Sequence, residues 1–321
     1  MNIMPRNPSI DILKCFAAVL ITNSHMDILY HPYDFLATGG AIGDVLFFFC
    51  SGFTLFLGKT IRFDNWYKKR IYRIYPTIFA VALYSSIIFN KNYNITDLLI
   101  NGGGWFVACI MIYYIPLYFI KRYWIKQVNV AFIIAAIITI IWYLFENRST
   151  IFMYGNTFFK WCHYFLFMLL GAIIGKSKKE WNFSLKQDSI SLIISIILYY
   201  IILFAGEKNE IISQFQILSL IPLLSITIYF FKICNSQFIL KLAKTKIIDW
   251  LITLIATLTL EIYLVQATMF TDKMNNIFPF NIPLMFVAII IVAYFIKILS
   301  RLFTQTFSEN QYIWKEIFKI K

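Results

Sequence analysis

Charge is scarce in this chain of 321 residues. Only 14% of the residues are charged, whereas 60% are hydrophobic and 19% are aromatic. A soluble protein of this length needs more polar side chains than that to cover its surface. The composition therefore excludes an ordinary soluble protein and predicts an all-α integral membrane protein.

Histidine and cysteine are also few. The three histidines have no spacing typical of metal ligands, and the five cysteines include no CxxC pair. Most of the cysteines fall inside apolar runs, where Cys behaves as a small hydrophobe. The sequence predicts neither a disulfide framework nor a metal site.

Acidic residues are outnumbered by basic ones, 16 against 29, which gives a formal net charge of +13. No basic domain carries this excess, and this argues against nucleic-acid binding. Most of the lysines and arginines lie in alternate segments between apolar runs, at 1–14, 59–73, 121–126, 176–186, 232–246 and 301–321. Because cytoplasmic loops collect basic residues, the pattern predicts that both termini are cytoplasmic. We expect a multi-pass membrane protein.

Long apolar runs are what the sequence does have. A spanning helix needs about 20 mostly apolar residues. About ten runs meet that requirement, near 9–30, 40–58, 71–90, 105–120, 127–145, 158–175, 188–205, 211–231, 247–270 and 282–303. No soluble insertion interrupts them, so residues 1–321 are expected to form one membrane domain. No small-residue cleavage site follows Arg6, and the first run is interpreted as a retained span.

The first run carries polar residues on one face. At 100° per residue, a helix aligns Asp11, Lys14, Ala18, Thr22 and His25 in a single stripe. An ionisable group in a membrane is a candidate functional residue, and a histidine can act as a general base. Two structural alternatives stay open: an ion pair at the helix end, and a buried histidine that bonds to a neighbouring helix.

Two further acidic residues within apolar runs are candidates for chemistry. Asp44 lies in "GAIGDVLFFFCSGFTLFLG" at a depth similar to that of His25, and it could orient or stabilise the imidazole. Glu261 lies in "TLTLEIYLVQ". A carboxylate there is unfavourable unless it is paired or solvated, so both join the catalytic candidates.

A basic cluster follows the second run in "KKRIYRIYP". Arg70 and Arg73 share a helix face beside Lys69, and guanidinium groups bind phosphate oxygens bidentately. The alternative is the ordinary cytoplasmic excess of charge in contact with anionic membrane lipids. The triple glycine of "NGGGWF", residues 102–104, permits a tight turn or a close ligand, or is simply flexible.

Four motifs in this order resemble the membrane acyltransferase family 3, the bacterial O-acyltransferases that modify surface polysaccharides. "SIDILKCFAAVLITNSH" is similar to the family's run that ends in a helix-one histidine, and "LFFFCSGFTL" to its Phe-Phe-x-x-Ser-Gly signature. "KKRIYRIYP" is similar to its Arg-x-x-Arg before Tyr-Pro, and "LEIYLVQ" to its Tyr-Leu-x-His run. The resemblance covers nearly the whole chain.

This resemblance implies a multi-pass acyltransferase of a bacterial inner membrane. Such an enzyme moves an acyl group, most simply acetyl from acetyl-CoA, to a carbohydrate hydroxyl. It implies that His25 is the catalytic histidine and that Arg70 and Arg73 bind the phosphates of CoA. Asp11 and Lys14 occupy its polar motif in helix one, where Lys14 replaces the usual arginine. Gln266 stands where many members have histidine. The alternative function is a flippase or transporter of a lipid-linked glycan, which would not bind CoA.

Overall fold

The computed structural model describes residues 7–148, 152–155, 157–177, 181–307 and 311–320. The regular elements of these residues are helices, and no strand occurs among them. The all-α prediction is confirmed.

The number of spans differs from the expected ten. Seven helical segments of the described chain are long and apolar enough to cross a membrane: Asp34–Leu57, Phe63–Phe89, Gly104–Tyr123, Ile125–Phe145, Leu185–Lys208, Gln216–Cys234 and Asn281–Thr306. The bent pair Lys246–Thr257 and Thr259–Met269 would make an eighth.

Helices α1 (Pro8–Asn23) and α8 (Lys160–Lys176) account for the other two runs. At 16 and 17 residues they are about 24 and 26 Å long, shorter than a hydrocarbon core of about 30 Å. The structure supports seven or eight spans, and the cytoplasmic placement of the termini stays a prediction.

The described residues divide into two compact units, whose boundaries fall within or beside helices α1, α3, α6 and α13. Unit 1 comprises the described parts of Met1–Ala17, Ala41–Lys59 and Ile115–Ile248. Unit 2 comprises the described parts of Ala18–Gly40, Thr60–Tyr114 and Asp249–Lys321.

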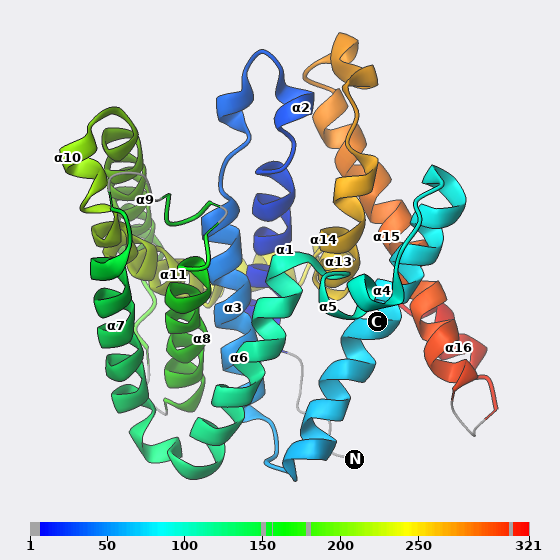
Figure 1. Cartoon of the computed structure of the whole chain (residues 1–321), viewed down its shortest axis with the longest axis horizontal. Coiled ribbons are helices and arrows are strands. Elements are labelled where there is room, and N and C mark those ends of the chain that lie inside the picture. Colours follow the sequence, from blue (N-terminus) through cyan, green and yellow to red (C-terminus); the bar gives the residue numbers. More distant parts are fainter. Residues whose placement is uncertain (1–6, 149–151, 156, 178–180, 308–310, 321) are drawn as a thin grey trace. The chain divides into compact units, whose positions relative to one another are not determined.

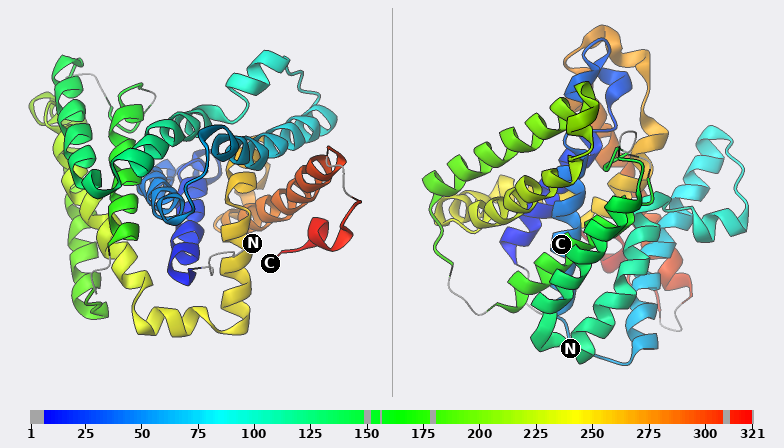
Figure 2. Two further views of the ribbon diagram at one scale, coloured as in Figure 1. Left: turned by 90° about the horizontal axis from the view of Figure 1, so that it is seen from below. Right: turned by 60° about the vertical axis from the view of Figure 1, so that its left-hand side comes forward.

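Unit 1 is a cluster of antiparallel helices. In it α7 (Val128–Phe145) packs along α8, and α9 (Leu185–Lys208) packs along α11 (Leu220–Cys234), as Figures 1 and 2 show. The short helices α10 (Glu210–Ser213) and α12 (Gln237–Ala243) and the 3-10 turns η2 (Ile125–Gln127) and η3 (Gln216–Ser219) join or flank them.

Glycine allows α3 (Gly40–Leu57) and α8 to approach closely within unit 1. A Cβ atom added at Gly52 would lie 1.8 Å from the Met168 carbonyl oxygen, and one added at Gly171 would lie 2.1 Å from that of Phe49. The two backbones are therefore in direct contact, which is the close helix packing expected for small residues in membranes.

The core of unit 2 is made by three helices that pack against one another: α4 (Phe63–Phe89), α14 (Thr259–Met269) and α15 (Asn281–Thr306). Helix α14 follows α13 (Lys246–Thr257) with a bend of 73°. Shorter elements complete the unit: α2 (Asp27–Tyr30), η1 (Asp34–Leu36), α5 (Ile95–Ile100), the first half of α6 (Gly104–Tyr123), η4 (Asp272–Ile277) and α16 (Trp314–Phe318).

Candidate active site

His25 lies in a turn just after α1. The helix was expected to continue to residue 30, but it ends at Asn23. The Asn23 side-chain amide donates to the carbonyl oxygens of Leu36 and Thr38, each at 2.9 Å, and its carbonyl accepts from the Tyr30 hydroxyl at 2.6 Å. These bonds hold the following segment against the helix end, so His25 is exposed rather than inside the helix.

His25 lines a pocket that belongs entirely to unit 2. The pocket has a volume of about 390 Å³. Three chain segments contribute to it, and their lining residues are His25, Gly102, Gly103, Gly104, Trp105, Tyr263, Leu264, Gln266, Ala267 and Phe270. A volume of this size is typical of small-molecule sites, in which apolar and aromatic walls surround a few polar groups. Histidine is the residue type in this set that most often serves as a general base.

The glycine segment makes a compact wall of the pocket. Gly104 has a φ of +65°, a conformation that L side chains rarely adopt. A Cβ atom at Gly103 would lie 2.4 Å from the Cβ of Val107. An added Cβ at Gly104 would lie 3.4 Å from the Tyr263 hydroxyl. Of the three interpretations of these glycines (a tight turn, a close ligand or flexibility), this geometry supports the tight turn.

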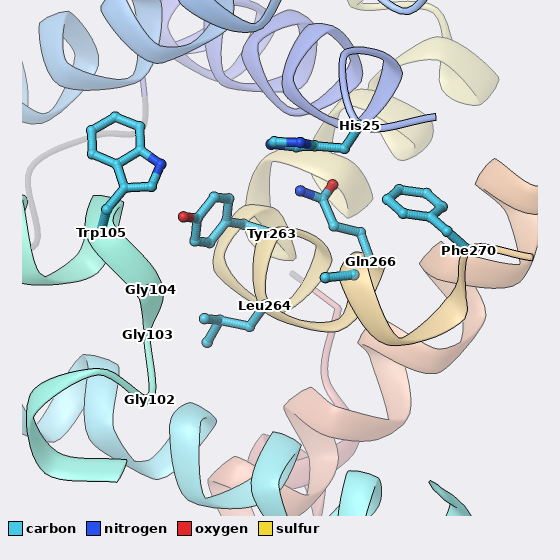
Figure 3. Close-up of a pocket in the computed structure, with 10 residues that line it drawn as sticks. His25, Gly102, Gly103, Gly104, Trp105, Tyr263, Leu264, Gln266 and Phe270 are labelled. Atoms are coloured by element: carbon cyan, nitrogen blue, oxygen red, sulfur yellow. The ribbon is translucent and has the colours of Figure 1, made fainter. Parts of the chain in front are cut away.

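Gln266 lies deep in the same pocket. Gln266 is only 2% exposed, and its Oε1 atom has no hydrogen-bond partner among the described residues. Figure 3 shows its carboxamide directed toward the imidazole of His25. From the sequence we expected Gln266 only to mark the loss of a second base, and the contribution of Tyr263, Trp105 and Phe270 was not predicted. The signal for these was weak, because aromatic residues are common throughout the chain.

Glu261 is also fully buried in unit 2, but it is not among the pocket-lining residues. Lys297 Nζ donates to its Oε1 at 2.8 Å, and the Thr77 hydroxyl donates to the same oxygen at 3.2 Å. The Thr77 and Ser300 hydroxyl oxygens are 3.1 Å apart. The carboxylate of α14 is thus bonded to both α4 and α15. The structure provides it with partners that stabilise a charge, and its predicted catalytic role stays a prediction.

The basic cluster lies in the first turns of α4. The Arg70 guanidinium carbon is 4.9 Å from the centre of the Trp66 ring and 5.8 Å from that of Tyr114. Arg70 is half-buried in this aromatic cradle, and its Nε has no hydrogen-bond partner among the described residues. Lys69 and Arg73 are exposed. One guanidinium is therefore held in place by cation–π contacts while its neighbours are accessible to an anion.

The remaining predicted site residues belong to unit 1. Asp11 and Lys14 are half-buried in α1 and lie near Cys50 of α3. Asp44 is 9% exposed, and the groups that act on its carboxylate are Tyr164 and Lys160 of α8. Asp44 thus has neighbours within its own unit, and its pairing with His25 stays a prediction.

Comparison with known protein families shows which class of enzyme this chain belongs to. The model of an acyltransferase domain family matches residues 7–301, nearly the whole chain. The chain belongs to the acyltransferase 3 family. No curated protein and no solved structure gives a significant match.

Membership of the acyltransferase 3 family confirms the resemblance that the four motifs indicated. The protein is a membrane acyltransferase, and it takes an acyl donor and an acceptor. In the described part of the chain, no group of three or more His, Cys, Asp or Glu side chains could hold a metal ion.

Proposed function

We propose that this protein transfers an acyl group, in the simplest case acetyl from acetyl-CoA, to a hydroxyl group of a surface or exported carbohydrate in a bacterial inner membrane. The observation that carries the proposal is the position of His25 in the unit 2 pocket. A histidine side chain can act as a general base and accept a proton from a hydroxyl group. No Lys, Arg, Asp or Glu occurs among the described residues that line this pocket.

The acceptor site is proposed in the pocket itself. Trp105, Tyr263 and Phe270 offer flat apolar faces, and Gln266 offers an amide. A sugar ring has apolar C–H faces and polar hydroxyl edges, so such a lining suits it. The pocket of about 390 Å³ accommodates a monosaccharide unit beside the thioester end of the donor, but not a whole nucleotide coenzyme.

The nucleotide part of CoA is proposed to bind at the basic cluster. Lys69, Arg70 and Arg73 supply three positive charges for its phosphates. Arg70 is preorganised by Trp66 and Tyr114, so less conformational freedom is lost when it binds. Asp11 and Lys14 of the family's polar motif belong to unit 1, and their role in binding the acyl donor stays a prediction.

Two reaction routes fit this arrangement. In direct transfer, His25 removes the proton of the acceptor hydroxyl as its oxygen attacks the thioester carbon. In the covalent route, His25 first carries the acyl group, and the acceptor hydroxyl then removes it. Radiolabel from acetyl-CoA trapped on the protein without acceptor would identify the covalent route, and its absence at a measurable turnover would favour direct transfer.

The test of the proposed function is acetyl transfer by membranes that contain the wild type or His25→Ala. With labelled acetyl-CoA and a surface polysaccharide as acceptor, His25→Ala should reduce the O-acetylation rate about 10²- to 10⁴-fold. His31→Ala is the matched control, because the His31 side chain is 75% exposed and lies outside the pocket. Full activity in His25→Ala would overturn the proposed role of this histidine.

A further inference from the structure

Gln266 has a position that packing alone does not explain. It is 2% exposed in an apolar helix, yet its carboxamide oxygen has no hydrogen-bond partner among the described residues. A buried amide oxygen without a partner is unfavourable, so native structures usually satisfy such atoms or use the groups that carry them. We propose that Gln266 is a catalytic residue that stabilises the oxyanion formed during acyl transfer. This inference rests on the proposed function.

The chemistry requires a hydrogen-bond donor at this place. When a hydroxyl oxygen attacks a thioester, the electrons of the C=O double bond move to the carbonyl oxygen, which becomes negative. Fixed donors aimed at that oxygen are a main source of rate enhancement in acyl transfer, and glutamine side chains serve in this way. The described lining residues include no Lys or Arg, so the charge is stabilised by neutral donors together with the imidazolium that forms on His25.

Among the lining side chains, Gln266 is placed best for this task. The neutral donors are the Gln266 amide, the Tyr263 hydroxyl and the indole N–H of Trp105. Figure 3 shows the carboxamide facing the His25 imidazole, whereas the Tyr263 hydroxyl is directed toward Trp105 and the glycine segment. An acyl carbon attacked by a hydroxyl bound to His25 would therefore have its carbonyl oxygen beside Gln266. Rotation about the last side-chain bond exchanges the amide oxygen and nitrogen, so the NH₂ group can be directed to that oxygen.

The helix that carries Gln266 is fixed in unit 2. Glu261, in the first turn of α14, bonds to Lys297 of α15 and to Thr77 of α4. Preorganised donors need no reorganisation as charge develops, and that is the condition for oxyanion stabilisation. The buried pair of Glu261 and Lys297 thus holds the helix that carries the Gln266 amide, although neither residue lines the pocket.

The step can be written completely. The acceptor hydroxyl gives its proton to a ring nitrogen of His25, and its oxygen forms a bond to the thioester carbon. The resulting oxyanion accepts a hydrogen bond from Gln266. It then re-forms the C=O bond, the C–S bond breaks, and the CoA thiolate takes the proton from the imidazolium. The products are the O-acyl ester and free CoA.

The test compares Gln266→Met, which keeps the shape and lacks donors, with Gln266→Asn, which keeps the amide on a shorter stem. We expect the kcat of Gln266→Met to fall about 10²- to 10³-fold, with the KM for acyl-CoA within twofold of wild type. Gln266→Asn should recover part of that rate. The acidic limb of the pH–rate profile should not move, since it reports protonation of the base, and a residue that only positions His25 would shift it.

The outcomes separate this inference from the proposed function. A Gln266→Met enzyme with a kcat within threefold of wild type, while His25→Ala is inactive, overturns the role of Gln266 alone. Full activity in His25→Ala overturns both. Equal losses in the methionine and asparagine variants, at unchanged unfolding temperature, also count against an amide donor.

Discussion

Lys297 Nζ of α15 lies 2.8 Å from Glu261 Oε1 of α14, within unit 2. The Glu261 side chain is fully buried and that of Lys297 is 21% exposed. An isolated carboxylate in the membrane interior is costly, so this contact accounts for how α14 tolerates an acidic residue. It also fixes the first turn of the helix that carries Tyr263 and Gln266 into the pocket.

Breaking this pair from the lysine side should destabilise the protein. Lys297→Met leaves the Glu261 charge buried without its partner, and we expect unfolding to become easier by about 3 kcal/mol. The double variant Lys297→Met/Glu261→Gln should recover most of the lost stability, since it contains no uncompensated buried charge. Chemical or thermal unfolding in detergent measures the stability of the single and the double variant. The exposed Lys273→Met serves as control, and a Lys297→Met protein as stable as this control would contradict the prediction.

The binding of the acyl donor, acyl-CoA, should depend on the shape of the Arg70 side chain as well as on its charge. Arg70→Lys keeps the positive charge but loses the flat group that lies against Trp66 and the bidentate geometry. We expect acyl-CoA to bind about tenfold more weakly, which is the effect expected from the loss of one charged hydrogen bond. Binding of labelled CoA to purified protein checks this. Lys68→Ala removes an exposed charge two positions away and should change binding much less.

Gly104→Ala should impair both the turn and the pocket. The φ of +65° is strained for alanine, which costs about 1 kcal/mol, and the new methyl group would approach the Tyr263 hydroxyl to 3.4 Å. We expect a lower kcat/KM for the acceptor and a small loss of stability. Gly58→Ala is the comparison, because its added Cβ would meet no atom closer than 3.5 Å. An active and stable Gly104→Ala enzyme would show that the turn adapts.

Gly171→Ala tests the contact between α3 and α8. Its methyl group would be forced against the Phe49 carbonyl oxygen at 2.1 Å, and such overpacking costs about 1 to 3 kcal/mol. Gly206→Ala, also in a helix of unit 1, would meet its nearest atom at 3.5 Å and should be neutral or stabilising. The unfolding midpoints of the two variants should move in opposite directions, or only that of Gly171→Ala should fall.

Local sequence signals predicted the helical class and most of the helix positions. Apolar runs of about 20 residues leave few alternatives to helices, because backbone groups in lipid have to be bonded within the segment. The end of α1 was less predictable. Its apolar pattern continues past Asn23, where the helix ends. The Asn23 side chain bonds there to Leu36 and Thr38, and no periodicity reveals such contacts. The same pattern predicted spans at α1 and α8, whose helices have 16 and 17 residues.

The sequence by itself determined that this is an α-helical membrane protein of the acyltransferase 3 family, with His25 and the arginines of α4 as candidates for its chemistry. These conclusions depend on composition and on motifs that are local in the chain. Only the tertiary structure decided which residues share a site. His25, the glycines at 102–104 and Gln266 come from three distant segments that meet in unit 2, and Glu261 is bonded to Lys297 on another helix. Such contacts arise from helix packing and from the need to pair buried polar groups, and neither is encoded in any single stretch of the chain.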